Sequence, residues 1–238
     1  ALVKGLCVAS VLTSAIWRYQ DTQPEASDDR KLTYLVERDG RPVGYVRLRG
    51  RQNHDWDRGA QVLEAYLPEQ DACLAALHLA KRIALEERQE QTIHLLIPFE
   101  TPLTRLAASL GAERRRGYAW YVRVLDRARF LMAIGPALER RLAASSFAGL
   151  TCRVALNLYE EALALHFDQG RLVSVTATSQ TSGFDLACPP TVMPMIWLGY
   201  RSVGEVLDSY PDAYCRRESR PVIEALFPKR DSWISSLL

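Results

Sequence analysis

The pattern of apolar and polar residues along the chain first predicts a tight turn between two apolar runs. Asp39 and Gly40 separate two largely apolar runs, Tyr34–Val36 and Val43–Val46. An Asp-Gly pair readily adopts the positive φ angles of a two-residue hairpin loop. The pattern therefore predicts a β-hairpin across these residues.

A strand followed by an amphipathic helix is predicted next. The extended run Val62–Leu67 ends at Pro68, whose fixed φ and missing N–H suit the first turn of a helix. Between Glu69 and Glu87 the apolar residues recur with a period of about 3.6 residues, at Cys73, Leu77, Ala80 and Ala84. This stripe indicates a helix that lies against a sheet.

Three further elements complete the first half of the chain. Thr92–Ile97 has the character of a buried strand, Thr101–Leu110 that of a short helix, and Tyr118–Leu125 that of a last strand. Gly111 follows the short helix where a left-handed cap is expected. Because helices connect several of the strands, the sheet is predicted to be mixed and the fold of this half to be α/β.

The pattern starts again after Asp126. One amphipathic helix is predicted through Phe130, Ile134, Leu138 and Leu142, followed by strands near Arg153–Tyr159, Ala162–Asp168 and Leu172–Ala177. The last two strands meet at a predicted turn, Gln169–Gly170. A polar loop, Thr178–Gly183, and short helices rich in Met, Trp and Leu follow, so this half is predicted to be α+β.

The length of 238 residues favours two domains of ordinary size, while one larger domain stays open. We expect the first at residues 1–125 and the second at residues 126–238. Two alternatives stay open for residues 1–31, which either complete the sheet and helices of the first domain or contact a domain encoded before Ala1.

Composition and charge exclude several classes of protein. The chain is 48% hydrophobic and 24% charged, as expected for a folded soluble protein, and its formal net charge is only +2. Such a balanced charge gives no support for capture of nucleic acid. No run approaches the roughly twenty apolar residues of a membrane-spanning helix. We therefore expect neither nucleic acid nor a membrane as a partner.

The cysteines indicate a reducing compartment. Five of them, an odd number, are scattered without the spacing of a metal site. We therefore expect reduced thiols, no metal and a cytoplasmic location, since residues 1–17 imitate a signal peptide only loosely. Cys188 lies in a loop before two prolines, but no histidine is near it in sequence, so it is a poor candidate nucleophile.

Several stretches resemble one superfamily. Leu35–Val46 is similar to the central hairpin of the GNAT superfamily of N-acetyltransferases, and Pro102–Glu113 to its late helix. Leu198–Ser202 with Val206–Leu207, and Ala225–Trp233, resemble the sterol-carrier-like domain that closes GNAT proteins of the enhanced-intracellular-survival type. The resemblance implies a GNAT-like mixed sheet with flanking helices, followed by a sterol-carrier-like α+β domain.

The resemblance also implies where acetyl-CoA would bind. GNAT enzymes hold its pyrophosphate with backbone N–H groups of a glycine-bearing loop that opens the helix after the central strand. In this chain that place is Leu67–Cys73, which has no glycine, lacks one N–H at Pro68 and carries Glu69 and Asp71. We therefore expect a degenerate GNAT-like domain that binds no cofactor, with acetyl-CoA held by an upstream GNAT catalytic domain of the parent protein.

Two candidate sites follow. In the relatives that the resemblance points to, the carboxylate of the last residue acts as a base in the upstream active site. Its counterpart here is the terminal carboxylate of Leu238. In the second domain, one apolar cluster either lines a lipid pocket or packs the core, and it consists of Met193, Met195, Ile196, Trp197 and Leu198.

Three functions stay open. The first is an acetyl-CoA-dependent amine N-acetyltransferase, in which these two domains shape the acceptor pocket and the assembly, and a small-molecule or peptide amine is the acceptor. The second is a lipid- or acyl-binding sterol-carrier-like module, and the third is a purely structural interaction unit. The sequence identifies neither the acceptor nor the oligomeric state, so a homo-oligomer also stays open.

Overall fold

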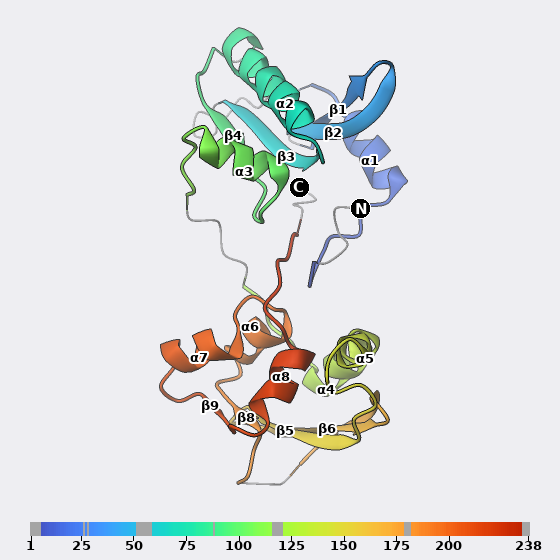
Figure 1. The fold of residues 1–238 in the computed structure, drawn as a ribbon, viewed down its shortest axis with the longest axis vertical. Coiled ribbons are helices and arrows are strands. Elements are labelled where there is room, and N and C mark those ends of the chain that lie inside the picture. The colour runs from blue at the N-terminus through green and yellow to red at the C-terminus, as the bar shows by residue number, and fades with distance from the viewer. Residues whose placement is uncertain are drawn as a thin grey trace. The chain divides into compact units, whose positions relative to one another are not determined.

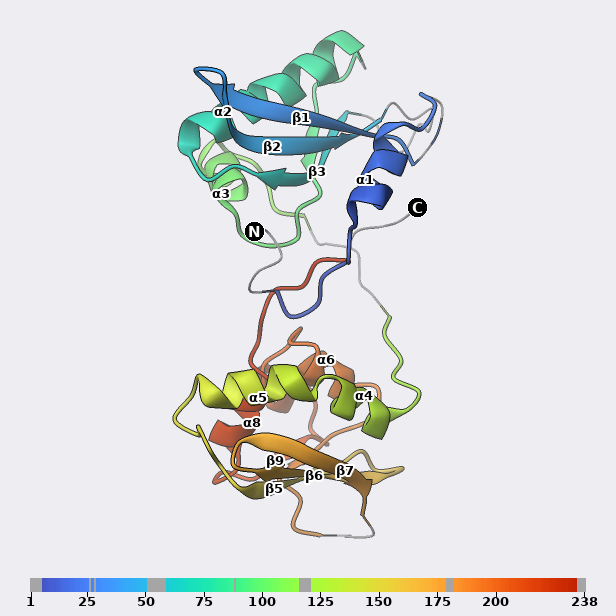
Figure 2. The ribbon, with the colours of Figure 1, turned by 90° about the vertical axis from the view of Figure 1, so that its right-hand side faces the viewer.

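The computed structural model describes residues 6–25, 27, 29–50, 59–87, 89–115, 121–178 and 182–234. The chain divides into two compact units, the first consisting of Ala1–Tyr118 with Trp233–Leu238 and the second of Ala119–Ser232. Each unit has its own sheet and its own hydrophobic core, and Figures 1 and 2 show their elements from two sides. Two mixed sheets with flanking helices confirm the predicted fold class.

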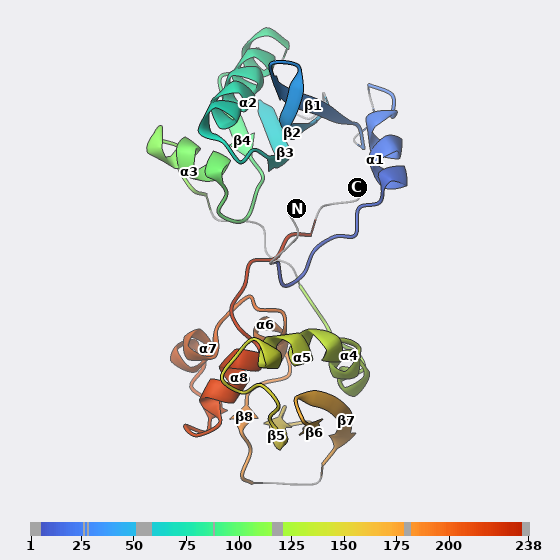
Figure 3. The same cartoon turned by 45° about the vertical axis from the view of Figure 1, so that its right-hand side comes forward.

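The first unit is built around a four-stranded sheet in the order β1-β2-β3-β4. Its elements are α1 (Ser14–Asp21), β1 (Lys31–Arg38), β2 (Arg41–Arg49), β3 (Ala60–Tyr66), α2 (Gln70–Arg82), the π-helix η1 (Ile83–Glu87), β4 (Ile93–Leu95) and α3 (Pro102–Ser109). The pair β3–β4 is parallel and the other pairs are antiparallel. Helix α2 covers one face of the sheet and α1 lies on the opposite side (Figure 3). The N-terminal segment that holds α1 therefore packs within the first unit.

The predicted hairpin and the two predicted helices of this unit are confirmed. β1 and β2 pair around Asp39 and Gly40, whose φ angles are 51° and 72°. Thr101 caps α3 with a capping box, and Gly111 beyond its end has a φ of 92°. The apolar stripe of α2 faces the sheet, as at Cys73, which is fully buried.

Two details of the first unit differ from the predictions. Pro68 lies outside α2, because Glu69 is an extended N-cap residue with φ −108° and ψ 148°. The predicted strand Thr92–Ile97 shortens to the three residues of β4, which are half-buried, since β4 is the edge strand and pairs only with the start of β3.

The predicted last strand, Tyr118–Leu125, is wrong over its described part. Residues 121–125 form no strand, and both Tyr121 and Leu125 are 83% exposed. Apolar residues make a strand only where a sheet edge accepts them, and no strand of the described residues lies beyond β4. Residues 116–120 lie outside the described part of the chain.

The second unit is built around a five-stranded sheet in the order β7-β6-β5-β8-β9. Its elements are α4 (Arg127–Ala133), α5 (Gly135–Ala143), β5 (Cys152–Asn157), β6 (Ala162–Asp168), β7 (Arg171–Ala177), β8 (Leu186–Ala187), α6 (Met193–Trp197), α7 (Val203–Ser209), β9 (Tyr214–Cys215) and α8 (Arg220–Leu226). β8 joins β5 in parallel and makes this sheet mixed as well. Helices α4, α5 and α8 lie on the same side of β5 and β6 (Figures 1 and 3).

The three predicted strands of this unit and the turn at Gln169–Gly170 are confirmed, and both turn residues have positive φ angles, 46° and 81°. The single predicted helix is wrong, because it divides into α4 and α5 at Ile134. Pro136 has no N–H and its ring clashes with the preceding turn of a continuous helix. The helix therefore ends just before it and a new one begins.

The end of the described chain returns to the first unit. Trp233 donates its backbone N–H to the carbonyl of Val8 at 2.8 Å and accepts the N–H of Ser10 at 3.1 Å. Its side chain is only 6% exposed. Two backbone hydrogen bonds and a buried indole therefore anchor this segment, while Leu238 lies outside the described residues.

Candidate functional site

The parallel strands of the first unit separate near their carboxyl ends. β3 and β4 pair from Ala60 with Ile93 to Val62 with Leu95, and Leu96 N–H still reaches the carbonyl of Val62 at 2.8 Å. β3 then continues to its end alongside β2. Ligands of open α/β sheets commonly bind outside the carboxyl ends of the strands. This end of the sheet is therefore the natural place for a site.

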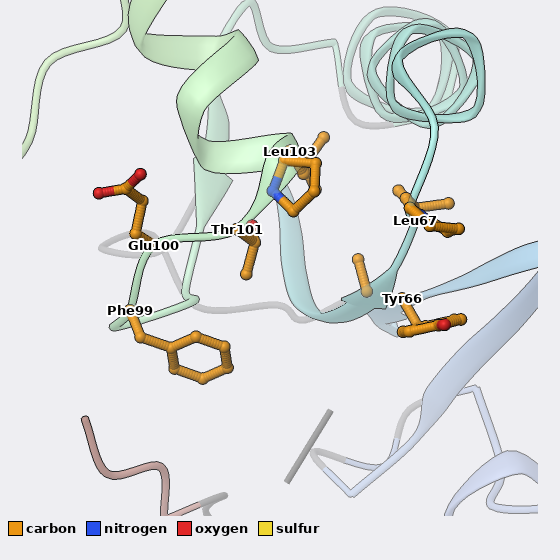
Figure 4. Close-up of a pocket in the computed structure, with 9 residues that line it drawn as sticks. Tyr66, Leu67, Phe99, Glu100, Thr101 and Leu103 are labelled. Carbon is orange, nitrogen blue, oxygen red and sulfur yellow. The ribbon is translucent and has the colours of Figure 1, made fainter. Parts of the chain in front are cut away.

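A cavity of about 330 Å³ lies at these strand ends, and we call it the strand-end pocket. One wall is the end of β3 with the loop to α2, and the other is the loop between β4 and α3 (Figure 4). The lining residues are Ala65, Tyr66, Leu67, Pro68, Phe99, Glu100, Thr101, Pro102 and Leu103. The volume is at the lower end of the range of small-molecule sites.

The polar side chains of the lining are largely engaged elsewhere. The Thr101 hydroxyl accepts the N–H of Thr104 at 3.1 Å in the α3 cap. Glu100 lies 3.4 Å from Arg105 Nε, and both side chains are mostly exposed. Figure 4 shows the Glu100 carboxylate turned away from Tyr66 and Leu67. The pocket therefore offers chiefly apolar surface.

A glycine allows the wall of the pocket to lie close to the hairpin. A Cβ atom at Gly44 would stand 2.4 Å from the carbonyl oxygen of Tyr66. Only glycine permits such an approach of one backbone to another. The position of the β3 end therefore depends on this residue of β2.

The start of α2 does not fit a pyrophosphate. Pro68 contributes no N–H, and the carboxylates of Glu69 and Asp71 lie 2.5 Å and 3.4 Å from the guanidinium of Arg38. A helix N-terminus binds anions through free N–H groups and positive charge. Here acidic side chains already pair with the nearby cation, so acetyl-CoA has no recognisable cradle at this helix.

A polar cluster lies on the other face of the sheet, beneath α1. Arg47 of β2 is 3% exposed, and its guanidinium lies 3.1 Å from Asp21 and 4.2 Å from the centre of the Trp17 ring. Its Nε donates to the hydroxyl of Thr33 at 3.0 Å. The Arg47 side chain thus joins its own strand β2 to α1 through a charge pair and a cation–π contact, and to β1 through a hydrogen bond.

The same cluster contains a buried carboxyl group. Tyr45 donates its hydroxyl proton to Glu64 Oε1 at 2.6 Å, and Arg47 Nη1 lies 4.0 Å from Glu64 Oε2. Burial raises the pKa of Glu64, although the hydrogen bond from Tyr45 and the charge of Arg47 oppose this effect. Burial, followed by the hydrogen bond to Glu64, also raises the pKa of Tyr45. Shifted groups of this kind occur at functional sites and in structural networks alike.

This cluster was not predicted from the sequence. Tyr45 and Arg47 alternate on β2, as Glu64 and Tyr66 do on β3, and such alternation is also typical of a solvent-exposed face. The pairing of Arg47 with Glu64 across the strands is what brings the charges together. The available signal was the alternation of Tyr45 and Arg47 with apolar residues, repeated by Glu64 and Tyr66 in the following strand.

The predicted apolar cluster of the second unit lies in its core. Met193 and Ile196 are fully buried, and Trp197 is 1% exposed with its ring 5.8 Å from that of Phe130. The Trp197 Nε1–H has no hydrogen-bond partner among the residues that the structure describes. Met195 and Leu198 are half-buried beside them. A lipid pocket at this cluster stays a prediction.

The two stretches that resemble a sterol-carrier-like domain lie together. Lys229 Nζ is 2.5 Å from Glu205 Oε1, and the backbone N–H of Arg230 donates to the carbonyl of Gly199 at 2.9 Å. The hydrogen bond from Lys229, with that from the N–H of Ser202, lowers the pKa of Glu205 to about 2. The two segments are therefore in tertiary contact, and a sterol-carrier-like fold of this unit stays a prediction.

The candidate thiol Cys188 is not activated. Cys188 is fully buried, and burial raises its pKa to about 12. A thiol is nucleophilic only as thiolate, so this residue is inert at neutral pH. Within the described residues, no group of three metal-binding side chains is present, and no helix combines the length and hydropathy needed to cross a membrane.

Comparison with known proteins places the fold. No family profile and no curated protein matches this sequence. Among solved structures, a GCN5-related N-acetyltransferase from Anabaena variabilis is similar with a TM-score of 0.59 at 12% identity, over 96% of this chain and 55% of that chain. A GCN5-related N-acetyltransferase from Kribbella flavida has a TM-score of 0.47 at 16% identity, over 88% and 49% of the two chains. Eis1 from Mycobacterium abscessus has a TM-score of 0.40 at 15% identity, over 92% and 53%.

The first of these likenesses defines the fold as GNAT-like. The sequence identity of 12% is too low to carry more than the fold. The chain spans about half the length of each of the three structures.

Proposed function

We propose that this chain is the C-terminal part of an acetyl-CoA-dependent amine N-acetyltransferase, whose acetyl-CoA is bound by a preceding GNAT domain. The observation that carries the proposal is a GNAT-like sheet in which the junction between β3 and α2 carries Pro68, Glu69 and Asp71 instead of a glycine-bearing anion loop. The likeness over 96% of this chain but 55% of an N-acetyltransferase supports the presence of a further lobe in the parent protein.

In this function the chain shapes the pocket of the acceptor amine and supplies a base. The thioester of acetyl-CoA is bound by the preceding domain. Trp233, five residues before Leu238, is held in the first unit by its backbone hydrogen bonds to Val8 and Ser10. The terminal carboxylate of Leu238 is our candidate for the group that takes the proton from the acceptor amine. A neutral amine must lose this proton when it attacks the acetyl carbonyl, and a carboxylate held nearby accepts it.

Titration of acetyl-CoA by calorimetry tests the absence of a cofactor site in this chain. The chain alone is expected to show no saturable binding tighter than a Kd of about 1 mM. The same protein with the sequence that precedes Ala1 in its reading frame is the positive control and is expected to bind in the micromolar range. Micromolar binding by the chain alone would overturn the proposal.

The terminal carboxylate is tested by moving it. Addition of one glycine after Leu238 displaces the charge, and it is expected to lower kcat of the parent enzyme and to shift the acid limb of its pH–rate profile. Glu113→Gln removes an exposed carboxylate elsewhere and is expected to leave both unchanged. An unaltered pH profile in the extended protein would exclude the terminal base.

A second candidate function is binding of a lipid or acyl chain by the second unit. The buried Trp197 Nε1–H favours it, since no acceptor reaches this donor within the described part of the chain and a buried donor costs free energy until an acceptor does. Native mass spectrometry of the purified protein is expected to show a lipid adduct, which Trp197→Phe weakens and Trp233→Phe leaves intact. Absence of any adduct would remove this candidate.

A further inference from the structure

Helix α1 is attached to the sheet by polar and aromatic contacts, on the side opposite to α2 (Figure 3). Gln20 is the only buried residue among its eight, while Ile16 and Trp17 are half-buried. Within the described part of the chain, no α1 side chain belongs to the hydrophobic core of the first unit. A helix on a sheet usually buries an apolar stripe. The attachment of α1 therefore depends on a few specific partners.

These partners converge on one carboxylate and one guanidinium. Asp21 Oδ1 accepts the hydroxyl proton of Thr33 at 2.9 Å and an N–H of Arg47 Nη2 at 3.1 Å. Nη2 also donates to Gln20 Oε1 at 3.3 Å, and the Trp17 ring lies 4.2 Å from the guanidinium. Hydrogen bonds between charged groups are among the strong ones. We call the pair of donors, Arg47 and Thr33, the carboxylate clamp.

The carboxylate clamp is built by the sheet and not by α1. Arg47 and Thr33 are direct partners in the register of β1 and β2, and Arg47 Nε donates to the Thr33 hydroxyl at 3.0 Å. Glu64 of β3 approaches the other side of the guanidinium, with Oε2 4.0 Å from Nη1. The clamp therefore keeps its cation and its hydroxyl donor when Asp21 leaves.

The chain on either side of α1 is anchored independently of the helix. Before α1, the backbone of Val8 and Ser10 is hydrogen-bonded to Trp233. After α1, Lys31 begins β1 opposite Arg49. A helix of eight residues is not stable on its own in water. Release of Asp21 from the clamp thus unfolds α1 while both anchors stay in place.

We propose that α1 is a releasable cover of a carboxylate-binding site. Arg47 and Thr33 hold Asp21 in the closed state and the carboxylate of a small ligand in the open state. The cover opens by local unfolding of α1, and the sheet and α2 stay folded. This site goes beyond the proposed transfer of an acetyl group and does not depend on it.

Hydrogen exchange read by mass spectrometry tests the release of α1 on the full chain. Peptides of α1 are expected to exchange at least about tenfold faster than those of β2, which exchange through larger openings. Asp21→Ala is expected to accelerate exchange in α1 by about a further tenfold, the weight of one hydrogen bond between charged groups, and to leave β5 of the second unit unchanged. Asp71→Ala, which removes a carboxylate 3.4 Å from the exposed Arg38, is the matched control and is expected to leave α1 unchanged.

Chemical rescue by sodium formate tests the clamp itself. In Asp21→Ala the clamp lacks its carboxylate, so formate is expected to stabilise the first unit against urea more than sodium chloride of the same concentration does. Wild type has a filled clamp and is expected to show no difference between the two salts. Asp21→Ala/Arg47→Met lacks the cation and is expected to lose the rescue, and the milder Asp21→Ala/Thr33→Val is expected to weaken it. Protection of the β2 peptides checks that each variant folds.

Three results would overturn the proposal. They are equal exchange rates in α1 and β2 of the wild type, an α1 that exchanges at the wild-type rate in Asp21→Ala, and formate that acts on Asp21→Ala no differently from chloride. Failure of acetyl-CoA to bind the parent protein, in contrast, would bear on the proposed acetyltransferase alone.

Discussion

Replacement of Arg47 by methionine provides the sharpest test of how the first unit is held together. Arg47→Met keeps the length of the side chain and removes the cation that lies between Asp21 and Glu64. The Glu64 side chain is 7% exposed, so its charge stays in the interior without a counter-charge. Asp21 is 34% exposed and regains water.

The expected loss of stability is about 3 kcal/mol, the lower end of the range for one partner removed from a buried pair. The lower end applies because Asp21 resolvates and because Arg47 Nη1 is 4.0 Å from Glu64. The double variant Arg47→Met/Glu64→Leu removes the isolated carboxylate too. It is expected to recover at least about 1 kcal/mol, since an apolar pair can replace a buried ionic one.

Hydrogen exchange read by mass spectrometry is the suitable assay, because it reports the opening of β2 and β3 separately from that of the second unit. Peptides of β5 and β6 serve as the internal control. Arg105→Met removes an exposed partner of Glu100 and is expected to cost less than about 0.5 kcal/mol. A loss below about 1 kcal/mol for Arg47→Met, or a double variant as unstable as the single one, would refute the reasoning.

Three further outcomes are expected. The pKa of Glu64 is raised above its ordinary value of 4.5, so the contribution of this one group to stability falls as pH rises from 4.5. Glu64→Gln lacks this contribution, and urea unfolding should show its stability relative to wild type improving toward pH 7. Lys229→Met removes the main cause of the low pKa of Glu205, and carboxyl NMR should show that pKa rising from about 2. Gly44→Ala should destabilise the first unit by about 1–3 kcal/mol in urea unfolding, because its Cβ would stand 2.4 Å from the Tyr66 carbonyl oxygen.

Each of these three expected outcomes can be contradicted by a specific result. A Glu64→Gln variant whose stability follows the wild-type pH profile between pH 4.5 and 7 would show that Glu64 does not titrate differently in the folded state. For Glu205, a lowered pKa supports stability above 4.5 that is lost as pH falls through about 2. Lys81→Met is the matched control there, and an equal effect of the two lysines would exclude the direct contact. Full stability of Gly44→Ala would mean that the hairpin shifts freely.

The features that the sequence predicted correctly are those that depend on neighbouring residues. Asp39 and Gly40 determine a turn by their own φ preferences, and the stripe through Cys73 determines which side of α2 meets the sheet. The break of the second unit's helix was also open to this reasoning, since Pro136 interrupts any continuous helix. The departure of Leu67–Cys73 from an anion loop was likewise evident from residue types alone.

What the tertiary structure decided is which distant residues meet. The strand-end pocket joins the end of β3 to a loop more than thirty residues later, and Arg47 links α1, β1 and β3. Trp233 lies in the first unit although the residues that precede it, up to Ser232, lie in the second. Turns and helical stripes follow from local torsion preferences and periodicity, whereas these sites depend on strand register and on packing between elements, which no local pattern encodes.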